Sequence, residues 1–343
     1  MKTKNMALLL LSATMLAGCG KVNEVPANNS EALGVIKKNA DAVVDGDSIS
    51  ADAKISGLSL SFSGAGESIK AKADWISAKA AAEGIHSSDQ AKFKASAEIG
   101  GSNAEFSFEA AAAEGDSVSS KKISDSASSL AAKVYVSDGT VYADMSDGKT
   151  VSFGNAVASA FGGDATLTVG KYAYGGLLDG KLPLIGNDWA SRISSAVGFA
   201  SDMAEKYPDS VKSYSTGVGY KTDITITDDV YHKLIASAEE SGKAVSSSSD
   251  GGIGEAITGM IYSLAESVSL KKATASVETF ADGSLSLSAG LDASMSLSAP
   301  SDLSDATVGQ SVKASVAFDL TATVRKGGTV GLPDDLTSYA KVS

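Results

Sequence analysis

The chain has 343 residues, a formal net charge of −12 and a single cysteine. The acidic balance argues against a nucleic-acid-binding protein and against electrostatic adhesion to anionic lipid. One thiol cannot close an intramolecular disulfide, so stability has to come from a buried core, which a chain of this length can build.

Residues 1–18 have the parts of a secretory signal peptide. Lys2 and Lys4 form a cationic head, an apolar run covers 7–16, and small residues follow. The run is too short to span a bilayer, which needs about 20 apolar residues. We therefore expect an exported protein.

The end of this segment, Leu16-Ala17-Gly18-Cys19, resembles the lipobox of bacterial lipoproteins. The resemblance implies that the signal is cut before Cys19 and that this cysteine is diacylated, which gives stable anchoring where one acyl chain is marginal. The alternative is an ordinary secretory signal with an incidental cysteine. We expect anchoring by lipid to the outer face of the cell membrane, or to an envelope membrane facing the periplasm in a host with two membranes.

Residues 19–30 are interpreted as the lipidated cysteine and a polar, flexible tether. The remainder, 31–343, is expected to form a single domain. An alternative division falls near 208–218, where Pro208 and two glycines interrupt the pattern.

Helical spacing and capping residues predict a helix from Ser30, taken as the N-cap, to Gly46. Three further helices are predicted over 187–207, over 228–241 and, after a serine-rich run, over 253–268. Residues 150–186 are expected to be loops with one short strand in "TLTVGKYAY".

Alternation of apolar and polar residues predicts the strands. They cover 49–55, 58–62, 69–75, 91–99, 104–112, 285–299 and 312–324. Gly57, where the alternation changes phase, is predicted to be a β-bulge. Gly100-Gly101 and Asp138-Gly139 are predicted to be hairpin turns.

Strands of this length should twist and coil instead of lying flat. The predicted fold class is therefore α+β, with a large, strongly curved antiparallel sheet in the form of a half-open β-barrel. Amphipathic helices are expected to cover its concave face.

A search for catalytic or metal-binding sets gives no candidate. The two histidines, His86 and His232, lie away from any metal-type cluster, and the sequence has no G-x-S-x-G elbow or P-loop ending. No enzymatic activity and no cofactor are predicted. An outer-membrane β-barrel is disfavoured by the amphipathic helices and by the low aromatic content of 6%.

Several predicted strands present mostly alanine on the apolar face, with larger residues at intervals. Such a face leaves volume that either close-packed helices or an apolar ligand could fill. The residues predicted to line a cavity or its lid are Phe93, Phe106, Phe108, Ile257, Ile261, Leu264, Leu287, Leu291, Met295 and Phe318.

The lipobox, the short first helix, the long strands and the terminal Pro333-Asp334-Asp335 segment together resemble the LolA/LolB-like lipoprotein carriers and mycobacterial lipoproteins of the LppX type. That resemblance implies a half-barrel with helices over an apolar, lipid-accepting cavity. The expected function is a non-enzymatic, membrane-anchored lipoprotein that binds or carries an acyl-chain ligand. The alternative is a non-catalytic interaction or scaffold protein with a dry core, whose protein partner the sequence does not identify.

Overall fold

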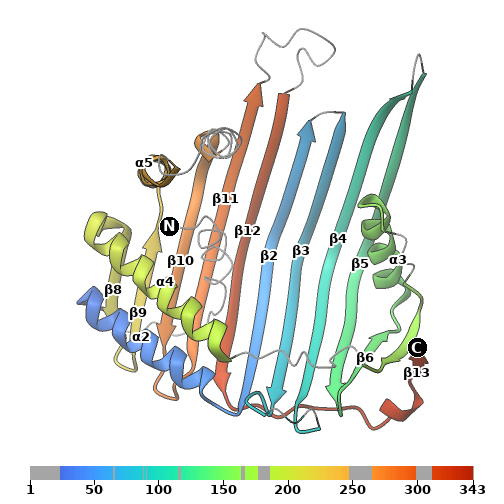
Figure 1. Ribbon diagram of the computed structural model, residues 1–343, viewed down its shortest axis with the longest axis horizontal. Coiled ribbons are helices and arrows are strands. Elements are labelled where there is room, and N and C mark those ends of the chain that lie inside the picture. Colours follow the sequence, from blue (N-terminus) through green and yellow to red (C-terminus); the bar gives the residue numbers. More distant parts are fainter. Residues whose placement is uncertain are drawn as a thin grey trace.

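The protein is built around one large, open β-sheet (Figure 1). The computed structural model describes residues 24–64, 66–87, 89, 91–114, 117–163, 167–176, 186–246, 265–298 and 311–342. In these ranges 13 strands follow the order β1-β8-β9-β10-β11-β12-β2-β3-β4-β5-β6-β7-β13, with β1 and β13 at the two edges.

The first half of the chain contributes the strands β1 (Val25–Ala27), β2 (Ser48–Gly64), β3 (Glu67–Glu83), β4 (Lys94–Glu114), β5 (Ser117–Ser137), β6 (Thr140–Met145) and β7 (Gly170–Tyr174). The second half contributes β8 (Val211–Ser215), β9 (Tyr220–Thr225), β10 (Val268–Thr279), β11 (Leu285–Ser298), β12 (Ser311–Lys326) and β13 (Ala340–Val342). The described helices are α2 (Asn29–Val44), α3 (Gly148–Ala160), α4 (Gly186–Lys206) and α5 (Asp228–Ser246), with 3₁₀ turns η1 (Pro208–Ser210) and η2 (Leu336–Ser338).

The prediction of helices combined with a large sheet that does not close is confirmed. The expectation of a purely antiparallel sheet is wrong at one edge, where β13 pairs in parallel with β7. The reason is the connection, because the chain leaves β12 and passes the ends of the intervening strands before it reaches β7. A long crossover of this kind permits parallel pairing, whereas a tight hairpin does not.

The predicted hairpin at Gly100-Gly101 is wrong, since both glycines lie inside the continuous 21-residue strand β4. Each glycine is paired on both sides, Gly100 with Ser77 and Ala131 and Gly101 with Ile76 and Leu130. A Cβ at residue 101 would lie 3.0 Å from Leu130 Cδ1. The glycines therefore make room for side chains of neighbouring strands, and they do not turn the chain.

The predicted bulge at Gly57 is confirmed, and it continues across three more strands. Gly57 has φ +61°, and the pairing of β2 with β12 shifts by one residue at this level. The apolar alternation also changes phase at Asp74 in β3, Asn103 in β4 and Ser128 in β5. Because all four strands carry the extra residue at the same level, the pairing among them stays in register.

The helix predictions are confirmed for α2 and α4, with corrections at some ends. α2 uses Asn28 as its N-cap instead of Ser30, because the Asn28 side chain accepts hydrogen bonds from the amides of Ser30 and Glu31. α5 continues past Gly242 to Ser246. Most of the helix expected over 253–268 lies outside the described residues, and its last residue, Val268, instead begins β10.

The region expected to be mostly loop, 150–186, contains most of α3 as well as the short strand β7. α3 begins after Asp147, whose carboxylate accepts hydrogen bonds from the backbone amide and the hydroxyl of Thr150. The hairpin predicted at Asp138-Gly139 is confirmed, with Ser137 opposite Thr140 and positive φ at both turn residues. These are the angles of a tight hairpin turn.

We expect that deleting Gly57 lowers the midpoint of unfolding in urea far more than a substitution at this position does. The deletion leaves the extra residue at Asp74 in β3 without its counterpart in β2, so the pairs beyond it, such as Leu60 with Ala71, can no longer form in their present register. In the matched variant Gly57→Ala the bulge remains, and the space around the new Cβ is open, so the cost is only about 1 kcal/mol for a left-handed φ. Urea unfolding followed by circular dichroism measures the stability of both variants. An equal loss of stability in the two would contradict the role assigned to the extra residue.

Candidate functional site

The sheet has one apolar face that runs without interruption across its central strands. One transverse row consists of Leu287 in β11, Ala322 in β12, Ala53 in β2, Ala78 in β3 and Ile99 in β4, each opposite the next. The alternation along β11 and β12 is unbroken, so rows further along these strands lie on the same face.

Helices α2 and α4 pack on this apolar face at one end of the strands. Ala40 and Val43 of α2 and Ile193 of α4 cluster with Leu285 and Val324 of the sheet. A second cluster joins Leu33, Ile36 and Ala200 to Ile224 and Val277. Figure 1 shows the two helices side by side in front of this end of the sheet.

Helix α3 packs on the same apolar face at the β5 edge. Its Ala160, Phe153 and Val157 cluster with Phe106 and Phe108 of β4. Two hydrogen bonds hold the helix to β5: the Ala131 amide donates to Thr150 Oγ1 at 2.8 Å, and Ser152 Oγ donates to Asp125 at 2.7 Å. α3 thus protects the part of the β5 edge that β6 does not reach.

The apolar face between these helices is partly open in the described part of the chain. Leu60 is 40% exposed and Ile99 is 43% exposed. Neither belongs to any of the clusters that contain helix residues. Since large apolar side chains in contact with water are unfavourable, this stretch is the candidate binding surface.

The residues predicted to line a cavity fall on one face but in separate groups. Phe106 and Phe108 lie beneath α3, Leu287 lies against α2 and α4, and Phe93 clusters with Ile85 beside the β3–β4 connection. The half-buried group in the middle of the sheet consists of Leu291, Met295 and Phe318. The structure does not gather these groups around one described cavity.

The remaining predicted residues lie outside the described part of the chain. They are Ile257, Ile261 and Leu264 of the expected lid and Leu16, Ala17, Gly18 and Cys19 of the lipobox. The hollow that the structure describes, of about 710 Å³, lies between β2 and β5. Its lining combines Leu60, Ala71 and Phe106 of the apolar face with polar-face residues, namely Ser61, Lys70, Ser107 and the ion pair of Lys72 with Glu105, so it differs from the expected apolar cavity.

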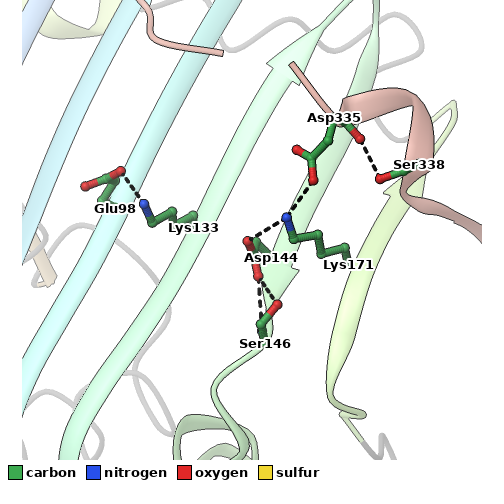
Figure 2. Close-up of polar contacts among 7 residues, drawn as sticks. All are labelled: Glu98, Lys133, Asp144, Ser146, Lys171, Asp335 and Ser338. Atoms are coloured by element: carbon green, nitrogen blue, oxygen red, sulfur yellow. Dashed lines mark hydrogen bonds and ion pairs between the residues drawn. The ribbon is translucent and has the colours of Figure 1, made fainter. Parts of the chain in front are cut away.

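A row of alternating charges crosses the polar face near the β7 edge. The register places Glu98 opposite Lys133, Lys133 opposite Asp144, and Asp144 opposite Lys171. Nζ of Lys171 lies 3.7 Å from Asp144 Oδ2 and 2.8 Å from Asp335 Oδ2. Figure 2 shows this lysine between the two carboxylates. The row therefore ties the C-terminal segment to β7.

The same segment is held by a buried aromatic residue, Tyr339, which is 4% exposed. Its ring lies 5.5 Å from that of Tyr142, and the ammonium of Lys171 lies 5.4 Å from its centroid. The Tyr339 hydroxyl has no hydrogen-bond partner among the described residues, and burial raises its pKa. The hydrogen bond from Lys171 holds the pKa of Asp335 below its ordinary value.

The described residues contain neither a membrane-spanning helix nor a cluster of metal-ligating side chains. No helix in these ranges is long and apolar enough to cross a membrane. Within the same ranges, no three or more His, Cys, Asp or Glu side chains are grouped so that they could hold a metal ion.

Sequence reasoning missed α3 and, with it, part of this surface. Its apolar stripe is interrupted by glycine and serine, as at Ser152 and Gly154. The available signal was the cap, because aspartate, here Asp147, is one of the residues preferred at the N-cap of a helix. The solvent exposure of Leu60 could not be predicted from the sequence, because it depends on which helix or loop covers this part of the strand.

Comparison with known proteins gives no further identification. No protein-family model, no curated protein and no solved structure matches the chain.

We expect Lys171→Met to loosen the C-terminal strand β13. Because the pKa of Asp335 is lowered in the folded state, its stabilising contribution is complete at neutral pH and is lost as the pH falls through that lowered value. The protection factors of the Ala340–Val342 amides, which are exchange rates corrected for the intrinsic effect of pH, should therefore fall on acidification in the parent protein, and they should already be low at neutral pH in Lys171→Met.

The control for this experiment is Asp334→Asn, which changes the neighbouring exposed carboxylate. It should leave exchange at β13 unchanged. Slow exchange of β13 in Lys171→Met at neutral pH would contradict the assigned role.

Proposed function

We propose that the protein is a non-enzymatic lipoprotein, anchored by an acylated Cys19, that binds an acyl-chain or other apolar ligand on the apolar face of its sheet. The observation that carries the proposal is the partly open stretch of that face, with Leu60 and Ile99 exposed by 40% and 43%. An acyl chain has the chemistry to cover such a stretch, because it offers apolar surface and needs no polar partner.

The geometry supports an elongated ligand. Along β11, Leu287 and Met295 lie on the same face, eight residues apart, which corresponds to about 27 Å of strand. The apolar face is therefore much longer, in the direction of the strands, than a single side chain is wide. Alanines occupy many positions between the larger residues, such as Ala53 opposite Ala78.

Curvature of the sheet into a half-barrel, with the helices over its concave side, belongs to the same proposal. Two features support it: α2, α4 and α3 pack on one face, and the strands reach 21 residues. Strands of this length accumulate twist. A curved sheet would bring the groups around Leu287 and Phe106 closer to one ligand.

The anchor is tested by Cys19→Ser. We expect the parent protein to sediment with membranes and the variant to accumulate in processed or unprocessed form without an N-terminal acyl group. Mass spectrometry of the N-terminal peptide measures this directly. An unmodified Cys19 in the parent protein would overturn the anchoring part of the proposal.

Ligand binding is tested by titrating the protein with a fluorescent fatty acid. We expect one saturable site and at least a tenfold loss of affinity in Leu60→Lys, because a charge replaces apolar surface in the binding stretch. Ser61→Lys is the matched control, since residue 61 is the next one on β2 but points to the polar face.

Two results would sink the proposal of ligand binding. One is the absence of saturable binding, and the other is an equal loss in both variants. The first result would favour the alternative of an interaction or scaffold protein with a dry core.

A further inference from the structure

A second set of exposed apolar side chains lies at the C-terminal end of α3 and on the segment that runs back along this helix. Phe161, at the C-terminal end of the helix, is 67% exposed, Leu167 is 40% exposed and Val169 is 57% exposed. We call these three residues the α3 ridge. Three large apolar side chains, one at the C-cap of α3 and two on the segment that follows the helix, form an exposed patch of the kind that marks an interaction site.

The ridge is held in place by specific contacts. Asn155 binds the backbone of Leu167 twice, accepting from its amide at 2.7 Å and donating to its carbonyl at 2.9 Å. The Tyr172 hydroxyl donates to the carbonyl of Val169 at 3.2 Å. A rigid display of apolar side chains loses little conformational entropy on binding, so it suits a docking surface.

Glycines in α3 allow this arrangement. A Cβ at Gly154 would lie 3.0 Å from Leu167 Cδ1, and one at Gly148 would lie 3.7 Å from Val169 Cγ2. The segment carrying Leu167 and Val169 therefore lies close along the helix, and the ridge extends from the start of α3 to its end.

The ridge is continuous with the apolar face of the sheet. The rings of Phe161 and Phe106 lie 6.4 Å apart, and Phe106 belongs to the core beneath α3. An apolar molecule that reaches Phe161 thus meets an apolar side chain leading toward the stretch around Leu60, which shares the transverse row of Phe106 through Ala71.

Positive charge flanks the ridge at both ends of α3. Lys121 donates to the carbonyl of Ser159 near the C-terminal end, and Lys149 donates to the hydroxyl of Ser128 near the N-terminal end. Both lysines are exposed, and both of these acceptors are neutral oxygens. The net charge of −12 opposes adhesion of the whole molecule to anionic lipid, but these two local positive charges are placed to meet phosphate groups at a lipid surface.

We propose that the α3 ridge docks on a phospholipid bilayer, with Phe161, Leu167 and Val169 in the interface and Lys121 and Lys149 on lipid phosphates. An exposed aromatic residue with aliphatic neighbours and flanking lysines is the pattern of an interfacial membrane contact. The inference rests on the proposed function, because it makes the bilayer the source or destination of the apolar ligand.

The orientation is compatible with the proposed anchor. α2, α4 and α3 pack on one face of the sheet, so a bilayer on that side meets α3 while the protein lies on its apolar face. Four residues separate Cys19 from Glu24, where the described chain begins, which spans at most about 18 Å. The lipid on Cys19 therefore stays near the β1 edge of the same sheet.

The test places a tryptophan reporter on the ridge. Trp75→Phe and Trp189→Phe remove the two native tryptophans, and Phe161→Trp adds the reporter. The full chain is purified from membranes and mixed with phosphatidylcholine–phosphatidylglycerol vesicles that contain brominated phosphatidylcholine. We expect strong quenching of Trp emission and a shift to shorter wavelength.

Lys79→Trp in the same background is the control, because residue 79 is exposed on the opposite, polar face. It should show neither change. Absence of quenching at position 161, or equal quenching at both positions, would overturn the docking, including the case in which the ridge instead contacts a protein or a second copy of the chain.

A second measurement separates this inference from ligand binding. In the Cys19→Ser background, where no acyl chain holds the protein, Phe161→Ser should weaken vesicle association by about tenfold or more, since one phenylalanine side chain returns to water, and it should leave saturable binding of the fatty acid from solution intact. Leu60→Lys should do the reverse. Loss of fatty-acid binding in Phe161→Ser with unchanged vesicle association would overturn the assignment of the ridge.

Discussion

The structure depends on keeping apolar side chains on one face of strands that reach 21 residues. A slip of one residue moves every following side chain to the other face. The extra residues at Gly57, Asp74, Asn103 and Ser128 meet this constraint together, because they occur at one level of four adjacent strands. Asn103 donates to the Asp74 carboxylate at 2.6 Å across this line. β12 carries no extra residue, so its pairing with β2 shifts by one residue at this level, and Val316 still lies opposite Leu60 on the apolar face.

Glycines inside strands make room for side chains of neighbouring strands, which can then contact each other across the strand that carries the glycine. Lys272 of β10 forms an ion pair with Asp319 of β12 above Gly290 of the intervening β11, and a Cβ at Gly290 would lie 2.4 Å from Lys272 Cε. Trp75 similarly lies over Gly100, with the Lys54 ammonium 5.4 Å from its ring. Exposed ion pairs contribute only about 0–1 kcal/mol each. Their larger effect here is on register, because a pair that spans three strands is broken by a slip of any one of them.

The sequence predicted those parts of the fold that depend on local pattern. The alternation in β11 and β12 and the phase change at Gly57 are local, and both are confirmed. The interior of β4 was misread because a Gly-Gly pair that accommodates neighbouring side chains has the same local signature as a turn. The parallel pairing of β13 with β7 joins segments far apart in sequence. The local alternation of apolar and polar residues therefore could not predict it. The candidate site was predictable only as a face, because the exposure of Leu60 depends on where the helices lie.

The two faces of the sheet differ in how many of their side chains find partners within the protein. On the polar face, charged side chains find partners on neighbouring strands, as Lys72 does with Glu105 and Lys133 with Glu98. On the apolar face, the described helices cover the two ends and leave apolar area near Leu60 in water. Each Å² of apolar surface that stays in water forgoes about 25 cal/mol of the stabilisation that burial would give to the folded state. An apolar molecule that covered the face would remove this unfavourable contact with water, so the constraint that aligns the strands would also supply the driving force for the proposed binding.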